Sequence, residues 1–166
     1  QPDVPPSICI KLDRSAAAAG TQQWCHHWKT ADGSITLSLA KNNDNYCLEV
    51  PGAARFEVSA DGKHLICRPE PSTPHAVTRH FLLDQILPRI FAHFFTYNVF
   101  HGSCVARGNR GICFLGDTGR GKSTLAAGFF KAGYRVLTDD CIRVFLENGE
   151  VYGIPKDQII GSTLET

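Results

Sequence analysis

The sequence has 166 residues, 43% hydrophobic and 20% charged, enough for one sizeable core or one core with a small accessory lobe. Seventeen basic and sixteen acidic residues give a formal net charge of +1, so the basic surface typical of proteins that bind nucleic acids or anionic membranes is missing. No apolar run has the length of a membrane span and residues 1–7 lack the features of a signal peptide, so we expect a cytoplasmic protein that binds neither nucleic acid nor membrane.

The cysteines do not form a recognisable framework. There are seven, an odd number at wide spacing, and no pair has the C-x-x-C spacing of a zinc or redox site. We expect most of them to be small core residues. The segment Cys25-His26-His27 has metal-ligating residue types. Because adjacent side chains point in different directions in a helix or a strand, we do not expect a metal site there.

Residues 1–72 contain short segments with the composition of strands. One lies near residues 8–10, and the others are separated by turn signals such as Asp32-Gly33 and Asp61-Gly62. The further segments are 35–39, 46–50, 55–58 and 64–67. This pattern predicts a small antiparallel β layer in which Trp24 and Trp28 pack, and residues 1–72 are interpreted as a β-rich N-terminal region.

Residues 73–166 are predicted to form a second region that begins with a helix. Apolar residues recur at helical spacing over 77–95. Thr73 is predicted to cap this helix, with Pro74 at its first position, and Pro88 is predicted to kink or divide it.

A β-hairpin is predicted next, with two strands in residues 99–115 joined by a tight turn at 107–111. If Arg107 pairs with Arg110, paired residue numbers sum to 217, and His101 lies opposite Gly116. A longer loop moves its partner one or two positions further. In each case His101 is expected beside the segment that follows the hairpin.

That segment, residues 116–123, reads G-x-x-x-x-G-K-S, the pattern of a phosphate-binding P-loop. In such a loop, backbone N–H groups surround the phosphates. From their positions in the motif, Lys122 is predicted to reach the outer phosphates and Ser123 to ligate Mg²⁺. Residues 123–131 are predicted to form a helix that ends at Gly133, with its positive end facing the phosphates. The predicted nucleotide-binding residues are Gly116, Asp117, Thr118, Gly119, Arg120, Gly121, Lys122, Ser123 and Thr124.

An acidic pair, Asp139-Asp140, follows a short strand predicted at 134–138. Because ligands of open α/β sheets bind at the carboxyl ends of strands, we expect the pair to meet the P-loop, with Asp140 as a second Mg²⁺ ligand. Residues 142–146 and 151–154 are predicted to form a further hairpin around Asn148-Gly149.

Together, His101-Gly102, the P-loop and Asp139-Asp140 resemble the catalytic domain of bacterial HPr kinase/phosphorylase. They are still more similar to shorter HPr-kinase-like proteins, some of which accompany peptide-modification gene clusters. The resemblance covers about residues 100–144. It implies an α/β fold with the P-loop core shared by HPr kinase and phosphoenolpyruvate carboxykinase, next to the small β-rich N-terminal region.

The sequence departs from that family in one motif. The later E-I-R-G-L-G-type acidic segment has no counterpart in residues 141–166. Three explanations are open: the chain is a fragment truncated before this element, it belongs to the short divergent group, or its metal site is incomplete. The phosphorylase activity is not carried over.

The resemblance implies a kinase that uses ATP and Mg²⁺ to phosphorylate a serine hydroxyl on a small protein or peptide, such as an HPr-like protein or a modified peptide precursor. It further implies that Asp139 is the base, that His101 orients it, and that Asp140 completes the catalytic set. Because HPr kinases form ring-like oligomers, a homo-oligomer is expected. Two alternatives are a small-molecule kinase or carboxykinase-like enzyme, and a nucleotide-binding sensor or scaffold without catalysis.

Overall fold

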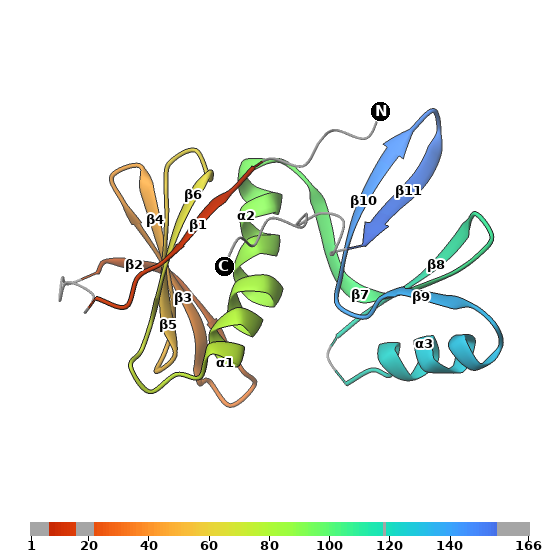
Figure 1. Cartoon of the computed structure of the whole chain (residues 1–166), viewed down its shortest axis with the longest axis horizontal. Helices are drawn as coiled ribbons and strands as arrows, with labels where there is room; N and C mark the ends of the chain where they lie inside the picture. The colour runs from red at the N-terminus through yellow and green to blue at the C-terminus, as the bar shows by residue number, and fades with distance from the viewer. Residues whose placement is uncertain (1–6, 16–21, 118, 156–166) are drawn as a thin grey trace. The chain divides into compact units, whose positions relative to one another are not determined.

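The computed structural model describes residues 7–15, 22–117 and 119–155 (Figure 1). Their contacts divide the chain into an N-terminal unit that extends to Ile90 and a C-terminal unit that starts at Phe91. The sequence pattern placed the boundary between residues 72 and 73, where the strand-like segments end. The division lies further along the chain because most of the helical segment belongs with the N-terminal strands.

The N-terminal unit is built on a six-stranded sheet in the order β1-β6-β5-β4-β3-β2. Strands β2 to β6 are successive antiparallel neighbours, whereas β1 pairs with β6 in parallel. The strands are β1 (Cys9–Leu12), β2 (Trp24–Lys29), β3 (Ile35–Asn42), β4 (Asn45–Val50), β5 (Ala54–Val58) and β6 (His64–Pro69). All predicted strands of this region are confirmed, and β2 is an addition to them.

Alternation along the strands gives this sheet one buried face. In β5, Ala54, Phe56 and Val58 are buried, and the residues between them are half-buried. Phe56 has no exposed surface, and burial of such a side chain contributes about 1.5–3 kcal/mol. Between these positions, Arg55 donates to Glu49 across the strands over 2.7 Å. The sheet therefore separates an apolar core face from a face with ion pairs.

Three helical segments follow the sheet: α1 (His75–His80), the π-helical segment η1 (Phe81–Ile86) and α2 (Leu87–Phe94). The predicted division at Pro88 is confirmed, since Pro88 is the second residue of α2 and η1 ends just before it. Proline has no N–H, and its ring crowds the carbonyl four residues earlier. The wider π-helical turn relieves this crowding.

The predicted helix cap at Thr73 is wrong. Helix α1 starts at His75 with Pro74 as its N-cap residue and without a side-chain cap. The Thr73 hydroxyl instead donates to the backbone carbonyl of Ala53 over 2.8 Å. Thr73 thus ties the segment before the helix to the end of the turn before β5, a contact between residues twenty positions apart that local sequence signals do not reveal.

The C-terminal unit has a five-stranded sheet in the order β11-β10-β7-β8, with β9 also paired to β7. Helix α3 packs against β7, β8 and β9 (Figure 1). The elements are β7 (Asn98–Arg107), β8 (Arg110–Leu115), α3 (Lys122–Lys131), β9 (Arg135–Thr138), β10 (Cys141–Glu147) and β11 (Glu150–Pro155). Both predicted hairpins, the predicted helix after the loop and the strand before the acidic pair are confirmed.

By secondary-structure content, the described residues form a mixed, sheet-rich fold with few helices. The strand-loop-helix-strand order around α3 is compatible with the predicted α/β class, and the specific core of the HPr kinase type stays a prediction. No helix in the described ranges is both long and apolar enough to cross a lipid bilayer.

Four of the seven cysteines are buried, as predicted for core residues, and three are exposed. The buried ones are Cys47, Cys67, Cys104 and Cys141. Burial raises the pKa of both Cys47 and Cys67 to about 11. These two thiols are therefore neutral near pH 7 and pack as small apolar side chains.

Candidate functional site

Two parallel strands of the C-terminal sheet end at the same edge. Strands β8 and β9 lie on opposite sides of β7 and are both antiparallel to it, so they run parallel to each other. Their last residues, Leu115 and Thr138, lead directly into residues 116–121 and into Asp139-Asp140. We call this edge, with the two segments that leave it, the loop edge. It has the arrangement that the strand order predicted for a ligand site.

The register of the hairpin places His101 at the loop edge. Gly102 pairs with Leu115 and Arg107 pairs with Arg110, so paired numbers sum to 217 as predicted for the two-residue turn. His101 is one position beyond the last of these pairs, level with the start of the predicted P-loop. On its other side His101 pairs with Cys141 of β10.

The ammonium group of Lys122 contacts the start of the glycine-rich segment that precedes it. Gly119 and Gly121 have φ angles of 81° and 82°, in the left-handed region where a side chain is strained. The Lys122 Nζ donates to the carbonyl of Gly116 over 2.8 Å and to that of Asp117 over 3.0 Å. The charged group and the glycine-rich backbone are therefore adjacent.

Helix α3 begins directly after this loop, with Gly121 as its N-cap. The described first turn has no acidic residue, and its N-cap makes no side-chain hydrogen bond. The positive end of the helix dipole is therefore not neutralised by a side chain in its first turn, a property of anion-binding helix starts. Ser123 and Thr124 are exposed in this turn. Thr118, predicted to belong to the same loop, lies outside the described residues.

Ser103 is a buried neighbour of the acidic pair that the motif analysis did not single out. Its side chain is 1% exposed, and its hydroxyl donates to Oδ1 of Asp139. Asp139 itself is exposed at the bend between β9 and β10. The carboxylate predicted to act as a base is therefore fixed at one oxygen by a buried donor. The signal for Ser103 is its position in the strand directly after the His-Gly pair.

The register explains this contact. Cys104 pairs with Thr138 and His101 pairs with Cys141, so the numbers of both pairs sum to 242, and the acidic bend continues the same alignment along β7. The Gly102 N–H donates to the Asp140 carbonyl over 2.8 Å. Across from it, a Cβ atom on Gly102 would lie 2.6 Å from a backbone oxygen of β8, so this position requires glycine.

His101 lies beside the second aspartate. Its Nδ1 is 3.4 Å from Oδ1 of Asp140, and its side chain is 57% exposed. The sequence analysis predicted that His101 orients Asp139, whereas the structure pairs His101 with Asp140 and gives Asp139 the Ser103 hydroxyl. The difference arises because successive residues of the acidic bend turn their side chains in different directions.

The predicted magnesium ligands Ser123 and Asp140 come from the two segments of the loop edge. The hydroxyl of Ser123 is exposed on α3, and the carboxylate of Asp140 is half-buried. Both offer oxygen atoms, which hard cations such as Mg²⁺ prefer, so the donor set fits this metal. The predicted residues of the other segment, Asp117 and Arg120, are exposed, and the Arg120 N–H donates to the Asp117 carbonyl over 3.3 Å.

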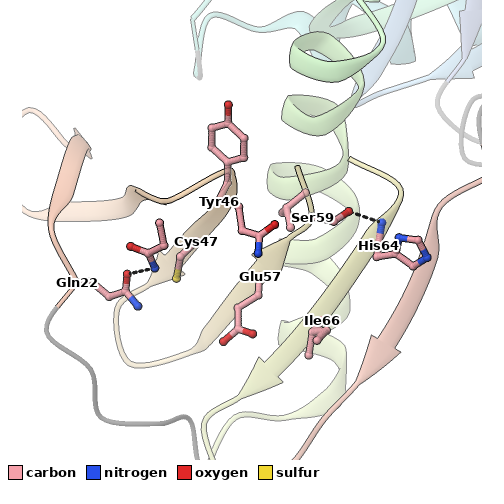
Figure 2. A pocket seen from close by; sticks show the side chains of 10 residues that line it. Gln22, Tyr46, Cys47, Glu57, Ser59, His64 and Ile66 are labelled. Atoms are coloured by element: carbon pink, nitrogen blue, oxygen red, sulfur yellow. Dashed lines mark hydrogen bonds between the residues drawn. The ribbon is translucent and has the colours of Figure 1, made fainter. Parts of the chain in front are cut away.

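Neither of two other hollows contains a predicted site residue. In the N-terminal unit, a hollow of about 270 Å³ is lined by polar side chains that include Glu57 and His64 (Figure 2). Figure 2 also shows the Ser59 hydroxyl accepting a hydrogen bond of 3.0 Å from the His64 backbone. In the C-terminal unit, a hollow of about 530 Å³ includes the turn residues Gly108 and Asn109, at the end of the hairpin away from the loop edge.

The histidines of the segment Cys25-His26-His27 make separate contacts in the N-terminal sheet. The ring of His26 meets Trp28 edge-on at 4.5 Å between centroids. The Nδ1 of His27 lies 2.8 Å from the hydroxyl of Ser38. The predicted packing of Trp28 is confirmed: it is half-buried, and the guanidinium of Arg89 lies 5.0 Å from its ring centroid.

Comparison with known proteins shows a similarity over part of the chain. The chain is similar to the HPr kinase/phosphorylase of Prosthecochloris aestuarii (strain DSM 271 / SK 413), with 30% identity over 98 residues. The match covers 55% of this chain and 28% of that protein, so the chain spans less than a third of the length of this relative. No protein-family model and no solved structure matches the chain. The similarity supports at most a distant relationship to that family.

Proposed function

We propose that the chain binds ATP with Mg²⁺ at the loop edge and transfers the γ-phosphoryl group to a serine hydroxyl of a small protein or peptide. One observation carries the proposal: the loop that holds Lys122 and the pair Asp139-Asp140 follow the carboxyl ends of two parallel strands. His101 lies on the strand between them. The distant similarity to HPr kinase/phosphorylase supports the same class of reaction.

The loop and α3 supply the phosphate site in this proposal. Backbone N–H groups of residues 116–124 face the phosphates, and Lys122 moves from the carbonyls it contacts to the outer phosphates. Ser123 and Asp140 hold Mg²⁺. When bound there, this cation would supply positive charge beside the phosphates.

Asp139 accepts the proton of the acceptor hydroxyl. The hydroxyl oxygen bonds to the γ-phosphorus while the bond from that phosphorus to the bridging oxygen breaks, and ADP leaves. The Ser103 hydroxyl occupies one carboxylate oxygen of Asp139, so the other oxygen is the one that takes the proton. His101 stays beside Asp140 and orients this metal ligand.

A second candidate function is nucleotide binding without transfer, as in a sensor or scaffold. It needs only the phosphate site formed by the loop and α3, without a base or an acceptor. Under this alternative the loop edge still binds ATP. The two functions therefore differ in the fate of the γ-phosphate.

Transfer can be tested by incubating the purified chain with ATP, Mg²⁺ and a panel of acceptors, namely an HPr-type protein and serine-containing peptides. Mass spectrometry of the acceptors should detect a phosphoserine that appears with the wild-type chain and disappears with Lys122→Ala. Binding of ATP without any phosphorylated acceptor, and without ATP turnover, would contradict the kinase proposal in favour of the sensor. A phosphorylated small molecule would replace the protein acceptor.

A further inference from the structure

Three side chains from β7, the bend between β9 and β10, and the start of β10 bring different ligand atoms close together. They are His101, Asp140 and Cys141, whose nitrogen, oxygen and sulfur atoms all lie within 4.8 Å of one another. His101 and Cys141 are directly opposite each other in the β7–β10 pair, which brings cross-strand side chains together. The acidic bend adds the carboxylate of Asp140 from the neighbouring position. The cluster is therefore set by backbone pairing on two sides.

Two of the three separations of these atoms match those around a tetrahedral metal. The Nδ1 of His101 is 3.4 Å from Oδ1 of Asp140, and the Sγ of Cys141 is 3.6 Å from the same oxygen. Zinc bonds of about 2.0 Å to nitrogen or oxygen and about 2.3 Å to sulfur place neighbouring tetrahedral ligands about 3.3 to 3.6 Å apart. Two of the three separations therefore already fit. The third pair of atoms, on His101 and Cys141, lies within 4.8 Å, and the exposed imidazole can turn towards the thiol.

The ligand types select the metal. Thiolate and imidazole ligands suit zinc, whereas Mg²⁺ takes oxygen ligands and does not favour sulfur. Three protein ligands with a fourth position open to water are the usual set of a reactive zinc site. Cys141 is 3% exposed, and its S–H proton would leave to solvent when the sulfur binds the metal.

We propose that His101, Asp140 and Cys141 form a binding site for Zn²⁺ with one open coordination position. Zinc binding at these residues requires no nucleotide. One consequence rests on the proposed function: since Asp140 is also the proposed ligand of Mg²⁺, zinc would compete with Mg²⁺ for this carboxylate and inhibit transfer. Low concentrations of zinc would then regulate the site through a residue that both metals share.

The binding site is tested on the full chain without nucleotide, using Co²⁺ as the spectroscopic probe and Zn²⁺ as its competitor. One equivalent of Co²⁺ should give a thiolate-to-cobalt charge-transfer band, which one equivalent of Zn²⁺ removes. Cys141→Ser should abolish the band. His101→Ala should keep a thiolate ligand but weaken the affinity for zinc by at least about tenfold, measured by calorimetry.

Another thiol pair provides the matched control. The Sγ atoms of Cys104 and Cys113 are 3.0 Å apart, so this pair is an alternative place for a thiophilic metal. Cys113→Ser, at an exposed position, should leave the band and the zinc affinity unchanged. A wild-type chain without the band, or a band lost in Cys113→Ser and kept in Cys141→Ser, would overturn the proposal.

Further measurements distinguish loss of the zinc site from loss of folding and from failure of the proposed kinase activity. If circular dichroism shows that Cys141→Ser, a change at a buried position, does not fold, the exposed variant His101→Ala decides, and unchanged zinc affinity in it would overturn the site. ATP binding in the absence of zinc binding would refute this inference alone. Zinc binding by a chain that binds no ATP would refute the proposed function and leave the zinc site standing.

Discussion

The two units use apolar residues in different ways. In the N-terminal unit, alternating strands bury a continuous core around Phe56 and Leu65, and its polar side chains pair across the outer face. In the C-terminal unit, large apolar side chains such as Phe130 and Val151 are exposed, although short stretches of β7 and β10 are buried. The polar groups at its loop edge are instead placed by strand register. The comparison indicates that packing stabilises the first unit, whereas pairing positions the chemistry in the second.

The largest effect is expected from the core of the N-terminal unit. Phe56→Ala should lower the free energy of unfolding of this unit by about 3–5 kcal/mol, because it removes a fully buried aromatic ring. Both tryptophans, Trp24 and Trp28, belong to this unit, so urea unfolding followed by tryptophan fluorescence reports on it selectively. Phe130→Ala, at a 64% exposed position of α3, should change the same curve by no more than about 0.5 kcal/mol. Equal shifts would invalidate the contrast between the units.

The next effect tests the chemistry at the loop edge. Asp139→Asn keeps the size of the side chain but removes its ability to take a proton, so transfer to the acceptor should fall by at least about a hundredfold. The affinity for ATP should stay nearly unchanged. The exposed Asp44→Asn in the N-terminal unit is the control and should transfer at the wild-type rate. Wild-type rates in Asp139→Asn would remove this residue from the mechanism.

A smaller effect distinguishes positioning from catalysis. Ser103→Ala removes the donor to Asp139 and should lower kcat by roughly tenfold, because a hydrogen bond to a charged group contributes about 1.5–3 kcal/mol. The KM for ATP should not change, so the loss should appear in kcat alone. Ser38→Ala, a buried serine whose hydroxyl lies beside His27, serves as the control without effect on transfer. An unchanged kcat in Ser103→Ala would leave Ser103 with a packing role only.

The smallest effect concerns the outer face of the N-terminal sheet. Glu49→Gln breaks the pair with Arg55, in which both side chains are partly exposed, at 31% and 21%. Solvent screens such pairs, so the free energy of unfolding should fall by about 0.2–1 kcal/mol. The same fluorescence-monitored urea titration measures it. A loss as large as that of Phe56→Ala would mean that ion pairs rather than packing dominate this unit.

Local sequence signals predicted most of the strands and helices. Turn residues and alternation located every strand of the N-terminal sheet except β2, and the two-residue turn fixed the register that puts His101 beside the loop. Two features could not be read in this way. The first is the hydrogen bond from the Thr73 hydroxyl to Ala53, which joins residues that are distant in the sequence. The second is the π-helical segment η1 ahead of Pro88, which depends on a local widening of the helix.

The candidate site shows the same limit. The motifs predicted that Asp139 and Asp140 meet the loop edge, since strand ends follow from sequence order. They did not reveal which neighbour each carboxylate takes. That choice depends on the bend between β9 and β10, which keeps the alignment along β7 and turns Asp139 towards Ser103 and Asp140 towards His101. Gly102 allows this close packing, and its role was visible only as part of the His-Gly pair.

The most direct measurement of the central claim is calorimetric titration of ATP with Mg²⁺ into the wild-type chain, Lys122→Ala and Lys131→Ala. Lys122 reaches the loop carbonyls, whereas Lys131 is an exposed lysine in the last turn of the same helix. The account predicts that the wild type and Lys131→Ala bind alike and that Lys122→Ala binds at least about tenfold more weakly, a difference of ~1.4 kcal/mol. Equal affinity in all three proteins, or no binding by the wild type, would contradict it.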